Sequence, residues 1–335
     1  MNYDSLDREL NTNLRSMYLL YGEEQYLIDM AVKKIKKKFG ELLLGINYIV
    51  LDETNINDLI PNIEMPAFGY DKKLIIVKNS GLFKKDGRKK APTEIQERVE
   101  NYITDNISII DEGVILVFVE KEVDKNSVYD LLERTGIVCQ IDLLKQNQLV
   151  QKLKKVCSLY KVNISDIVLN HLIEVSGTNL QDLMNEIRKL IEYAGENGTI
   201  TQKDIELLAS KQIESVIFDL TDSLGAKQTN KALEVLDNLI YQKEPLQKIL
   251  ITLYNHFKKL YLCKEAVKLN KDVIVSLNLK PNQTFLVTKY KKQSSYFKGD
   301  DLKYLLDELV NLDYNSKIGN IDIDVGLRSI LCRFC

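Results

Sequence analysis

The first residues whose types and spacing suggest chemistry form the turn Gly22-Glu23-Glu24-Gln25, between the apolar run Met17–Tyr21 and an amphipathic segment. Phosphate-binding loops occur in the same order of elements: a strand, a glycine turn and then a helix. Such a loop also needs a second glycine, a lysine and a Ser or Thr, to supply backbone N–H groups, a positive charge and a magnesium ligand. The turn has none of these, and its two carboxylates would repel a phosphate at the helix start. We therefore expect no nucleotide here, and we expect Glu23 and Glu24 to stabilise the first helical turn.

Other catalytic patterns are also missing. An ATPase needs carboxylates after a buried strand to hold magnesium, but the apolar run that begins at Leu74 is followed by Lys78 and Asn79. The second buried run ends at Glu120, which we interpret as a solvated strand end. The two histidines, His171 and His256, form no Ser/His/Asp pattern, and we expect each on an ordinary helix face.

The cysteines are irregularly spaced and odd in number, which argues against a disulfide framework: Cys139, Cys157, Cys263, Cys332 and Cys335. The last two form a CxxC pair, but zinc would require a second ligand pair and a redox site would require a helix after the motif. We interpret them as free thiols. The sequence therefore predicts no catalytic residue, no cofactor and no metal.

The overall composition is that of a globular protein with more than one domain. The chain has 335 residues, 45% of them apolar, and a net charge of −2, so any contact with nucleic acid requires a local basic patch. It has no run of 18 apolar residues and opens on a polar, acidic segment. We expect no secretory signal, no membrane contact and a cytoplasmic location.

The periodicity of apolar residues predicts how these segments are positioned. Strands are expected at the following runs: Met17–Tyr21, 48–51, 74–78, 114–119 and 137–141. Helices are expected between them, including 56–60, ended or bent by Pro61, and Thr93–Asp105. Most of these strands lack polar alternation, which is typical of a mostly parallel sheet covered on both faces.

After residue 144 no further strand is expected, and helical spacing dominates. Thr201 and Asp204 form an N-terminal capping pair, and Pro245 suits the first turn of a long helix that runs to about Val267. The sequence therefore predicts an α/β domain (1–143), a small helical domain (144–212) and a larger helical domain (213–335).

Several segments, in order along the chain, resemble the delta subunit family of bacterial DNA polymerase III. They are YLLYGEEQYLIDMAVKKI from Tyr18, MPAFGYDKKLIIVKN from Met65, VILVFVEKEVDK from Val114, SGTNLQDLMNEIRKLIEYA from Ser176, and the C-terminal run that includes LVNLDYNSKIGNID from Leu309. The resemblance covers roughly residues 17–330. It rests on the ordered set, because no single motif is decisive.

The resemblance implies an AAA+-like fold with a degenerate nucleotide site, a helical lid and a helical collar. It implies a clamp-loader subunit that binds and opens the sliding clamp (the beta subunit) for loading onto primed DNA. The subunit would not hydrolyse ATP and would belong to a DNA polymerase holoenzyme, a nucleotidyltransferase. The implied partners are tau or gamma motor subunits and delta-prime in a pentameric ring. Two alternatives remain open: a divergent nucleotide-dependent ATPase, and a related non-hydrolysing clamp-loader subunit.

The resemblance places the clamp-binding loop at Met65-Pro66-Ala67-Phe68-Gly69, with Phe68 as an apolar plug. Ala67 departs from the family pattern, in which two bulky apolar residues are adjacent. The alternative is that Phe68 packs inward as a core residue.

Basic residues gather at two places, and we expect both to be solvated surfaces rather than DNA contacts. The first is the loop from Lys84 to Pro92, with Lys84, Lys85, Arg88, Lys89 and Lys90. The second is the helix segment with Lys33, Lys34 and Lys36 to Lys38. Neither has the interleaved aromatic residues on which bases stack.

Overall fold

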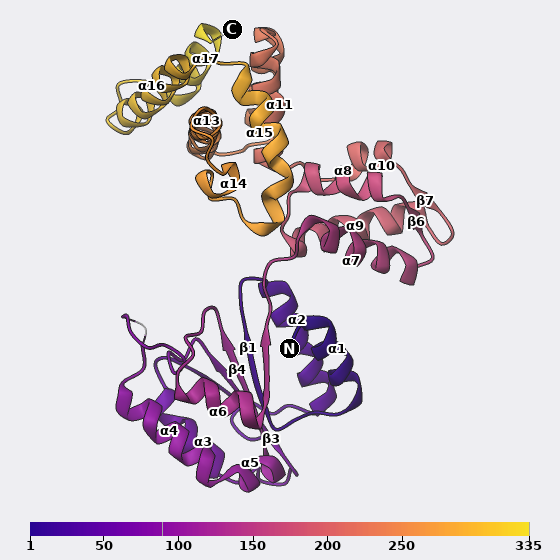
Figure 1. Cartoon of the computed structure of the whole chain (residues 1–335). Helices are drawn as coiled ribbons and strands as arrows, with labels where there is room; N and C mark the ends of the chain where they lie inside the picture. The colour runs from indigo at the N-terminus through magenta and orange to yellow at the C-terminus, as the bar shows by residue number, and fades with distance from the viewer. Residues whose placement is uncertain (89, 335) are drawn as a thin grey trace. The chain divides into compact units, whose positions relative to one another are not determined.

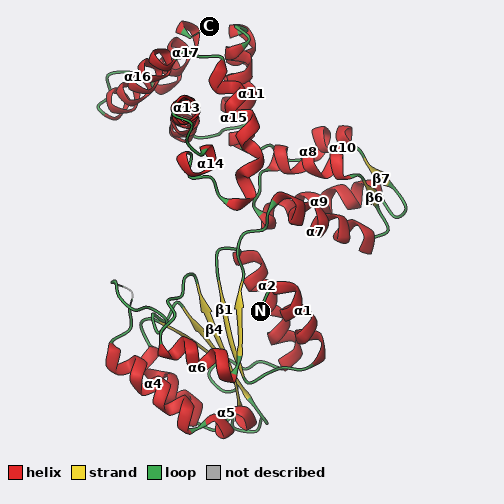
Figure 2. Ribbon diagram, viewed as in Figure 1, coloured by secondary structure: helices red, strands yellow, loops and turns green. Residues whose placement is uncertain are grey.

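The computed structural model describes residues 1–88 and 90–334. The chain separates into two compact units, the first ending at Leu143 and the second beginning at Leu144 (Figure 1). The first unit is α/β and the second is almost entirely helical (Figure 2). The expected fold class is therefore confirmed.

The first unit is built on a five-stranded sheet in the order β2-β3-β4-β1-β5, and every neighbouring pair is parallel. Its strands are β1 (Met17–Tyr21), β2 (Tyr48–Asp52), β3 (Lys73–Lys78), β4 (Val114–Glu120) and β5 (Ile137–Gln140). Each lies where the apolar runs predicted it. In β4 every residue is buried, as expected for a strand covered on both faces.

Helices cover both faces of this sheet. They are α1 (Tyr3–Thr12), α2 (Gln25–Phe39), α3 (Leu59–Glu64), α4 (Thr93–Asp105), α5 (Ile107–Gly113) and α6 (Ser127–Thr135), with a 3-10 turn at Ile56–Asp58. Alternate strand residues such as Leu19, Val77 and Phe118 pack with α3, α4 and α6 in one cluster. In Figure 2, α1 lies beside α2, and α4 and α6 lie across the sheet from them.

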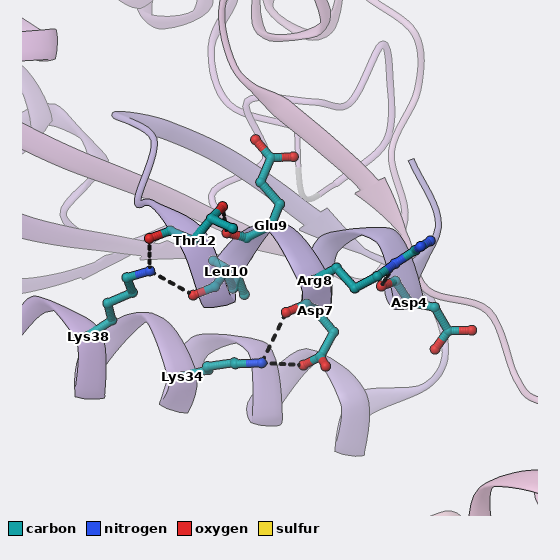
Figure 3. A network of polar contacts seen from close by, with 8 residues as sticks. All are labelled: Asp4, Asp7, Arg8, Glu9, Leu10, Thr12, Lys34 and Lys38. Atoms are coloured by element: carbon teal, nitrogen blue, oxygen red, sulfur yellow. Dashed lines mark hydrogen bonds and ion pairs between the residues drawn. The ribbon is translucent and has the colours of Figure 1, made fainter.

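Helix α1 was not expected from the sequence. The Asn2 side chain caps it by accepting a hydrogen bond from Ser5 N, and its buried face consists of Leu6 and Leu10. Two lysines of α2 hold it in place (Figure 3). Lys34 Nζ donates to the carboxylate of Asp7 at 2.8 Å, and Lys38 Nζ donates to the carbonyls of Leu10 and Thr12. Lys34 is therefore not a merely solvated surface residue, whereas Lys38 is exposed, as predicted.

The sequence predicts that Pro61 ends or bends the helix before it, but Pro61 lies within a helix that continues past it. It is the third residue of α3, which continues to Glu64. Proline is tolerated there because N–H groups in the first helical turn have no partner within the helix. The segment 56–60 instead divides into the 3-10 turn and the start of α3.

The second unit begins with four helices: α7 (Gln146–Leu159), α8 (Asp166–Ser176), α9 (Leu180–Ala194) and α10 (Gln202–Leu208). The capping box of Thr201 and Asp204 is confirmed at the start of α10. The expectation of no further strand is wrong, because β6 (Asn163–Ile164) and β7 (Thr199–Ile200) form a short parallel pair. Two residues are too few to produce a visible periodicity.

The remaining helices are α11 (Ile213–Gly225), α12 (Thr229–Tyr241), α13 (Leu246–Lys268), α14 (Val273–Ser276), α15 (Val287–Ser295), α16 (Gly299–Lys317) and α17 (Ile323–Arg333), with a 3-10 segment at Pro281–Leu286. They share one apolar core centred on α13. Pro245 is the residue before α13 rather than part of its first turn. Our division of this second unit at residue 213 stays a prediction.

His256 lies on α13, on the helix face that packs into this core. Its Nε2 is 2.8 Å from Gln293 Oε1, while Gln293 Nε2 donates to Phe218 O. Since the amide nitrogen is already used as a donor, His256 Nε2 carries the proton shared with Gln293. Burial lowers the pKa of His256 to about 4, so the ring is neutral at pH 7. Among the helices of residues 1–88 and 90–334, none is long and apolar enough to cross a membrane.

Candidate functional site

The loop Met65 to Gly69, which we call the Phe68 loop, connects α3 to β3 at the amino edge of the parallel sheet. Met65 ends α3 in an extended conformation, and Tyr70 N donates to Ala67 O at 3.2 Å, which closes a tight turn. Phe68 and Gly69 both have positive φ, 28° and 92°. A positive φ is costly for an aromatic residue and is found where the surrounding structure fixes the chain. The turn therefore holds Phe68 in a defined backbone conformation.

The side chain of Phe68 points away from the core. It is 68% exposed, and Met65 is 49% exposed. The alternative that Phe68 packs inward is therefore wrong. Pro66 is also exposed and Ala67 is half-buried. The turn presents two large apolar side chains to solvent, those of Met65 and Phe68, and neighbouring exposed apolar groups are candidates for a binding surface.

Lys73 holds the start of the Phe68 loop through two hydrogen bonds. The side chain of this first residue of β3 is buried, with 1% of the residue exposed. Its Nζ donates to Asn62 O at 2.8 Å and to Met65 O, two carbonyls at the end of α3. Desolvation lowers the pKa of Lys73. The ammonium satisfies helix-end carbonyls and complements the negative end of the helix dipole, so it fixes where α3 stops and the loop begins.

The opposite, carboxyl edge of the sheet holds the Gly22 turn. Gly22 N donates to Glu120 O at 3.4 Å, and Glu24 N donates to Ile141 O at 3.0 Å. These N–H groups face strand-end carbonyls and so are not available to surround a phosphate. A Cβ on Gly22 would lie 2.3 Å from Ile141 O, so the turn sits directly against β5.

Glu24 differs from its expected position. It precedes α2, which begins at Gln25, and only 6% of it is exposed, whereas Glu23 is exposed. The N–H of Glu24 donates to Ile141 O, which holds this residue against the end of β5.

Glu120 is also buried, not a solvated strand end. It is 5% exposed and accepts hydrogen bonds from Ser80 N at 2.8 Å and Ser80 Oγ at 2.6 Å. Burial raises the pKa of this carboxyl, against the opposing effect of the Ser80 hydrogen bonds. One carboxylate oxygen, Oε1, therefore joins the end of β4 to the residues that follow β3. In the part of the chain that the structure describes, no group of three or more His, Cys, Asp or Glu residues could hold a metal ion.

The basic loop after Phe83 is fixed at its base. Lys84 forms an ion pair with Glu122 at 2.9 Å, and the buried Gln96 donates to the carbonyls of Leu82 and Lys84. Lys85 and Arg88 are exposed, while Lys89 lies outside the described residues. Among the described residues, no hydrogen bond or ion pair joins Lys84, Lys85 or Arg88 to residues 65–69.

The described cysteines are unpaired, in agreement with the free thiols that were expected. Cys139, Cys157 and Cys263 are buried and Cys332 is exposed. Burial raises the pKa of Cys139 and of Cys157 to about 11, so both are protonated thiols at pH 7. The CxxC pair cannot be described in full, because Cys335 lies outside the described residues.

Sequence reasoning missed two features around the Phe68 loop. Lys72 and Lys73 look alike in the sequence, yet Lys72 is exposed and Lys73 is buried. The second is a run of apolar residues just before β2, Leu42 to Ile46, which periodicity assigns to no element. Composition could have indicated this exposed run, because four large aliphatic side chains in five residues are unusual in a loop.

Two family models match the chain. The model described as DNA polymerase III, delta subunit matches residues 18–142, and the model described as DNA polymerase III delta subunit, C-terminal domain matches residues 214–334. A probable DNA polymerase III subunit delta of Aquifex aeolicus (strain VF5) is 32% identical over 94% of this chain and 90% of its own length. The DNA polymerase III subunit delta of Bacillus subtilis (strain 168) is 22% identical, covering 95% and 92%.

A solved structure has the same fold over nearly the whole chain. It is the Bacillus subtilis DNA clamp loader delta protein, with a TM-score of 0.75 at 20% sequence identity, covering 99% of both chains. The likeness therefore extends across both units of the chain.

Proposed function

Because the chain belongs to the DNA polymerase III delta subunit family, we propose that it is a clamp-loader subunit that binds the sliding clamp through Phe68 and opens it. The observation that carries this proposal is an aromatic side chain held outward by a fixed turn. Phe68 is 68% exposed at positive φ, and the buried Lys73 sets the position of the loop behind it.

The proposed contact has the chemistry of a binding hot spot. A buried aromatic ring removes about 150–250 Å² from water, and a few such residues supply most of the energy of an interface. Met65 adds a second exposed apolar side chain, whereas Ala67 adds little area. Pro66 and Gly69 complete the loop that presents the ring. Phe68 is therefore the expected anchor, and it enters an apolar pocket on the clamp.

Opening follows from differential binding. A ligand shifts an equilibrium only by the difference between its affinities for the two states. Delta would therefore bind the clamp more tightly in the shape that allows the interface to open. The energy of the Phe68 contact would then be used to favour that shape.

The proposal includes no ATP hydrolysis by this chain. The Gly22 turn has no phosphate-binding lysine or hydroxyl, and its N–H groups face the carbonyls of Glu120 and Ile141. Both observations support a degenerate nucleotide site. ATP hydrolysis would then belong to tau or gamma motor subunits, which would form a cytoplasmic pentameric ring with delta and delta-prime on primed DNA. The second unit would supply the helical lid and the collar.

The test is clamp affinity of the full-length Phe68→Ala variant. We expect a loss of roughly thirtyfold to a thousandfold, which corresponds to about 2–4 kcal/mol. Folding should be nearly intact, because an exposed side chain leaves no core cavity. Retained affinity together with an unchanged melting temperature would reject Phe68 as the anchor.

An ATP titration by calorimetry tests the alternative of a divergent ATPase. We expect no binding tighter than about 100 µM. Tighter stoichiometric binding would contradict the interpretation of the Gly22 turn.

A further inference from the structure

The turn just before β2 exposes a cluster of aliphatic side chains. We name residues 42–46 the leucine turn: Leu42, Leu43, Leu44, Gly45 and Ile46. Leu44 is 74% exposed, Ile46 40% and Leu43 39%. Single exposed apolar residues are ordinary, but several in five consecutive positions form a patch, and patches on folded proteins mark contact surfaces.

The leucine turn has a fixed backbone. Leu43 O accepts hydrogen bonds from the N–H groups of Ile46, Asn47 and Tyr48 at 3.1–3.2 Å. The side chain of Asn47, which is fully buried, accepts from Leu43 N at 2.7 Å and donates to Glu41 O at 2.9 Å. These hydrogen bonds fix the backbone that carries the exposed leucines. Binding of a partner would therefore lose less conformational entropy of the turn.

The leucine turn lies beside the Phe68 loop. It enters β2 and the Phe68 loop enters β3, and these strands are parallel neighbours in which Tyr48 pairs with Leu74. Entering segments of parallel neighbours meet at the same edge of a sheet. Just beyond the two segments, Leu74 N donates to Asn47 O at 2.8 Å, which fixes the register of the strands that they enter. Residues that flank the two segments, among them Glu41, Asn47, Tyr70 and Lys72, line one hollow of about 890 Å³ at this edge.

We propose that the leucine turn is a second apolar contact with the sliding clamp, beside the Phe68 plug. This inference rests on the proposed function. The occupant is the clamp because the leucine turn lies at the same edge of the sheet as the Phe68 loop, and the two segments enter neighbouring strands. A partner seated on Phe68 therefore extends along this edge towards the leucine turn. The contact also compensates for Ala67, because Leu44 supplies the apolar area that the Phe68 loop itself lacks.

The decisive variant is Leu44→Ser in the full-length chain, measured by its affinity for the purified clamp. Burial of one leucine side chain corresponds to about one to two powers of ten in affinity. We therefore expect a loss of at least about tenfold. Leu44→Met keeps an apolar side chain of similar volume and should bind within about threefold of the wild type.

Leu159→Ser is the matched control. Leu159 has the same residue type and the same 74% exposure, but it ends α7 in the second unit. It should leave clamp affinity unchanged. Neither serine variant should lower the melting temperature appreciably, since both side chains are largely in solvent. Equal effects of the two serine variants would overturn the proposal.

The outcomes separate this inference from the proposed function. If Phe68→Ala weakens clamp binding and Leu44→Ser does not, the second contact is wrong and the function stands. If Phe68→Ala has no effect, the proposed anchor itself fails. Light scattering addresses the other possible occupant: if Leu44→Ser abolishes self-association and leaves clamp affinity unchanged, the patch joins copies of this chain and the proposal is overturned.

Discussion

Replacing Lys73 with methionine tests how the Phe68 loop is held. Methionine keeps the length and apolar stem of the side chain but removes the ammonium. Asn62 O and Met65 O would then lose their shared donor at the end of α3. We expect Lys73→Met to destabilise the first unit and to loosen the turn that presents Phe68.

The size of the effect follows from two opposing contributions. Each hydrogen bond from a charged group contributes about 1.5–3 kcal/mol, so two bonds contribute about 3–6 kcal/mol. The buried ammonium also carries a desolvation cost, which is the reason its pKa is lowered, and methionine removes that cost. We therefore expect a net loss of about 1–3 kcal/mol in the free energy of unfolding.

Urea denaturation and clamp affinity should be measured on the same protein, with Lys72→Met as the matched control. Lys72 is the adjacent lysine, but it is exposed and donates to Asp111 O at 3.0 Å. Its replacement should change stability by no more than about 0.5 kcal/mol. Clamp affinity should fall about three- to tenfold in Lys73→Met, because Phe68 must be ordered again on binding.

Two results would refute this reasoning. A Lys73→Met protein that unfolds at the wild-type urea concentration would mean that the ammonium contributes no net stability. A destabilised protein with wild-type clamp affinity would mean that Lys73 stabilises the sheet without positioning Phe68.

Two further predictions concern stability. The pKa of His256 is about 4 when folded and about 6.5 when unfolded, so the unfolded state binds the proton first as the pH falls and stability is lost between these values. From pH 7 to pH 5 the wild type should therefore lose about 2 kcal/mol more than His256→Leu in urea denaturation, and equal losses would contradict the buried neutral ring. Gly22→Ala should cost more than about 2 kcal/mol, because φ is 132° and the new Cβ meets Ile141 O. Gly40→Ala, with φ 104° and no atom within 4 Å of the Cβ, should cost less, and equal melting temperatures of the two variants would contradict the close approach at Gly22.

Buried strands were predictable because a strand covered on both faces must be apolar throughout. The run that became β4 illustrates this, since its six apolar residues, Val114 to Val119, are all buried. The helix Thr93–Asp105 was predicted with its observed bounds. Helix α1 was missed because only Leu6 and Leu10 are buried in it, although Asn2 is a recognisable capping residue.

The candidate site was less predictable because it depends on register and tertiary packing. Lys73 occupies the same face of β3 as Ile75 and Val77 and is buried where its Nζ meets the end of α3, whereas Lys72 lies one residue before the strand and is exposed. The sequence does not show which of the two lysines is buried until the first residue of the strand is known. The place of Phe68 came from the family resemblance, and its exposure depends on a backbone turn that periodicity does not encode.

The strand order also has a consequence for how the chain folds. Strand β1 is the first strand made, yet its two neighbours are β4 and β5, and Leu19 pairs with Phe118, roughly a hundred positions later. Pairing between distant segments slows folding, because the entropy cost of closing a long loop comes before any stabilising contact forms. During synthesis the apolar run Met17–Tyr21 therefore stays without its partners until most of the first unit has emerged. Pulsed hydrogen exchange during refolding should show late protection of the Leu19 and Leu20 amides, and early protection would exclude this order of events.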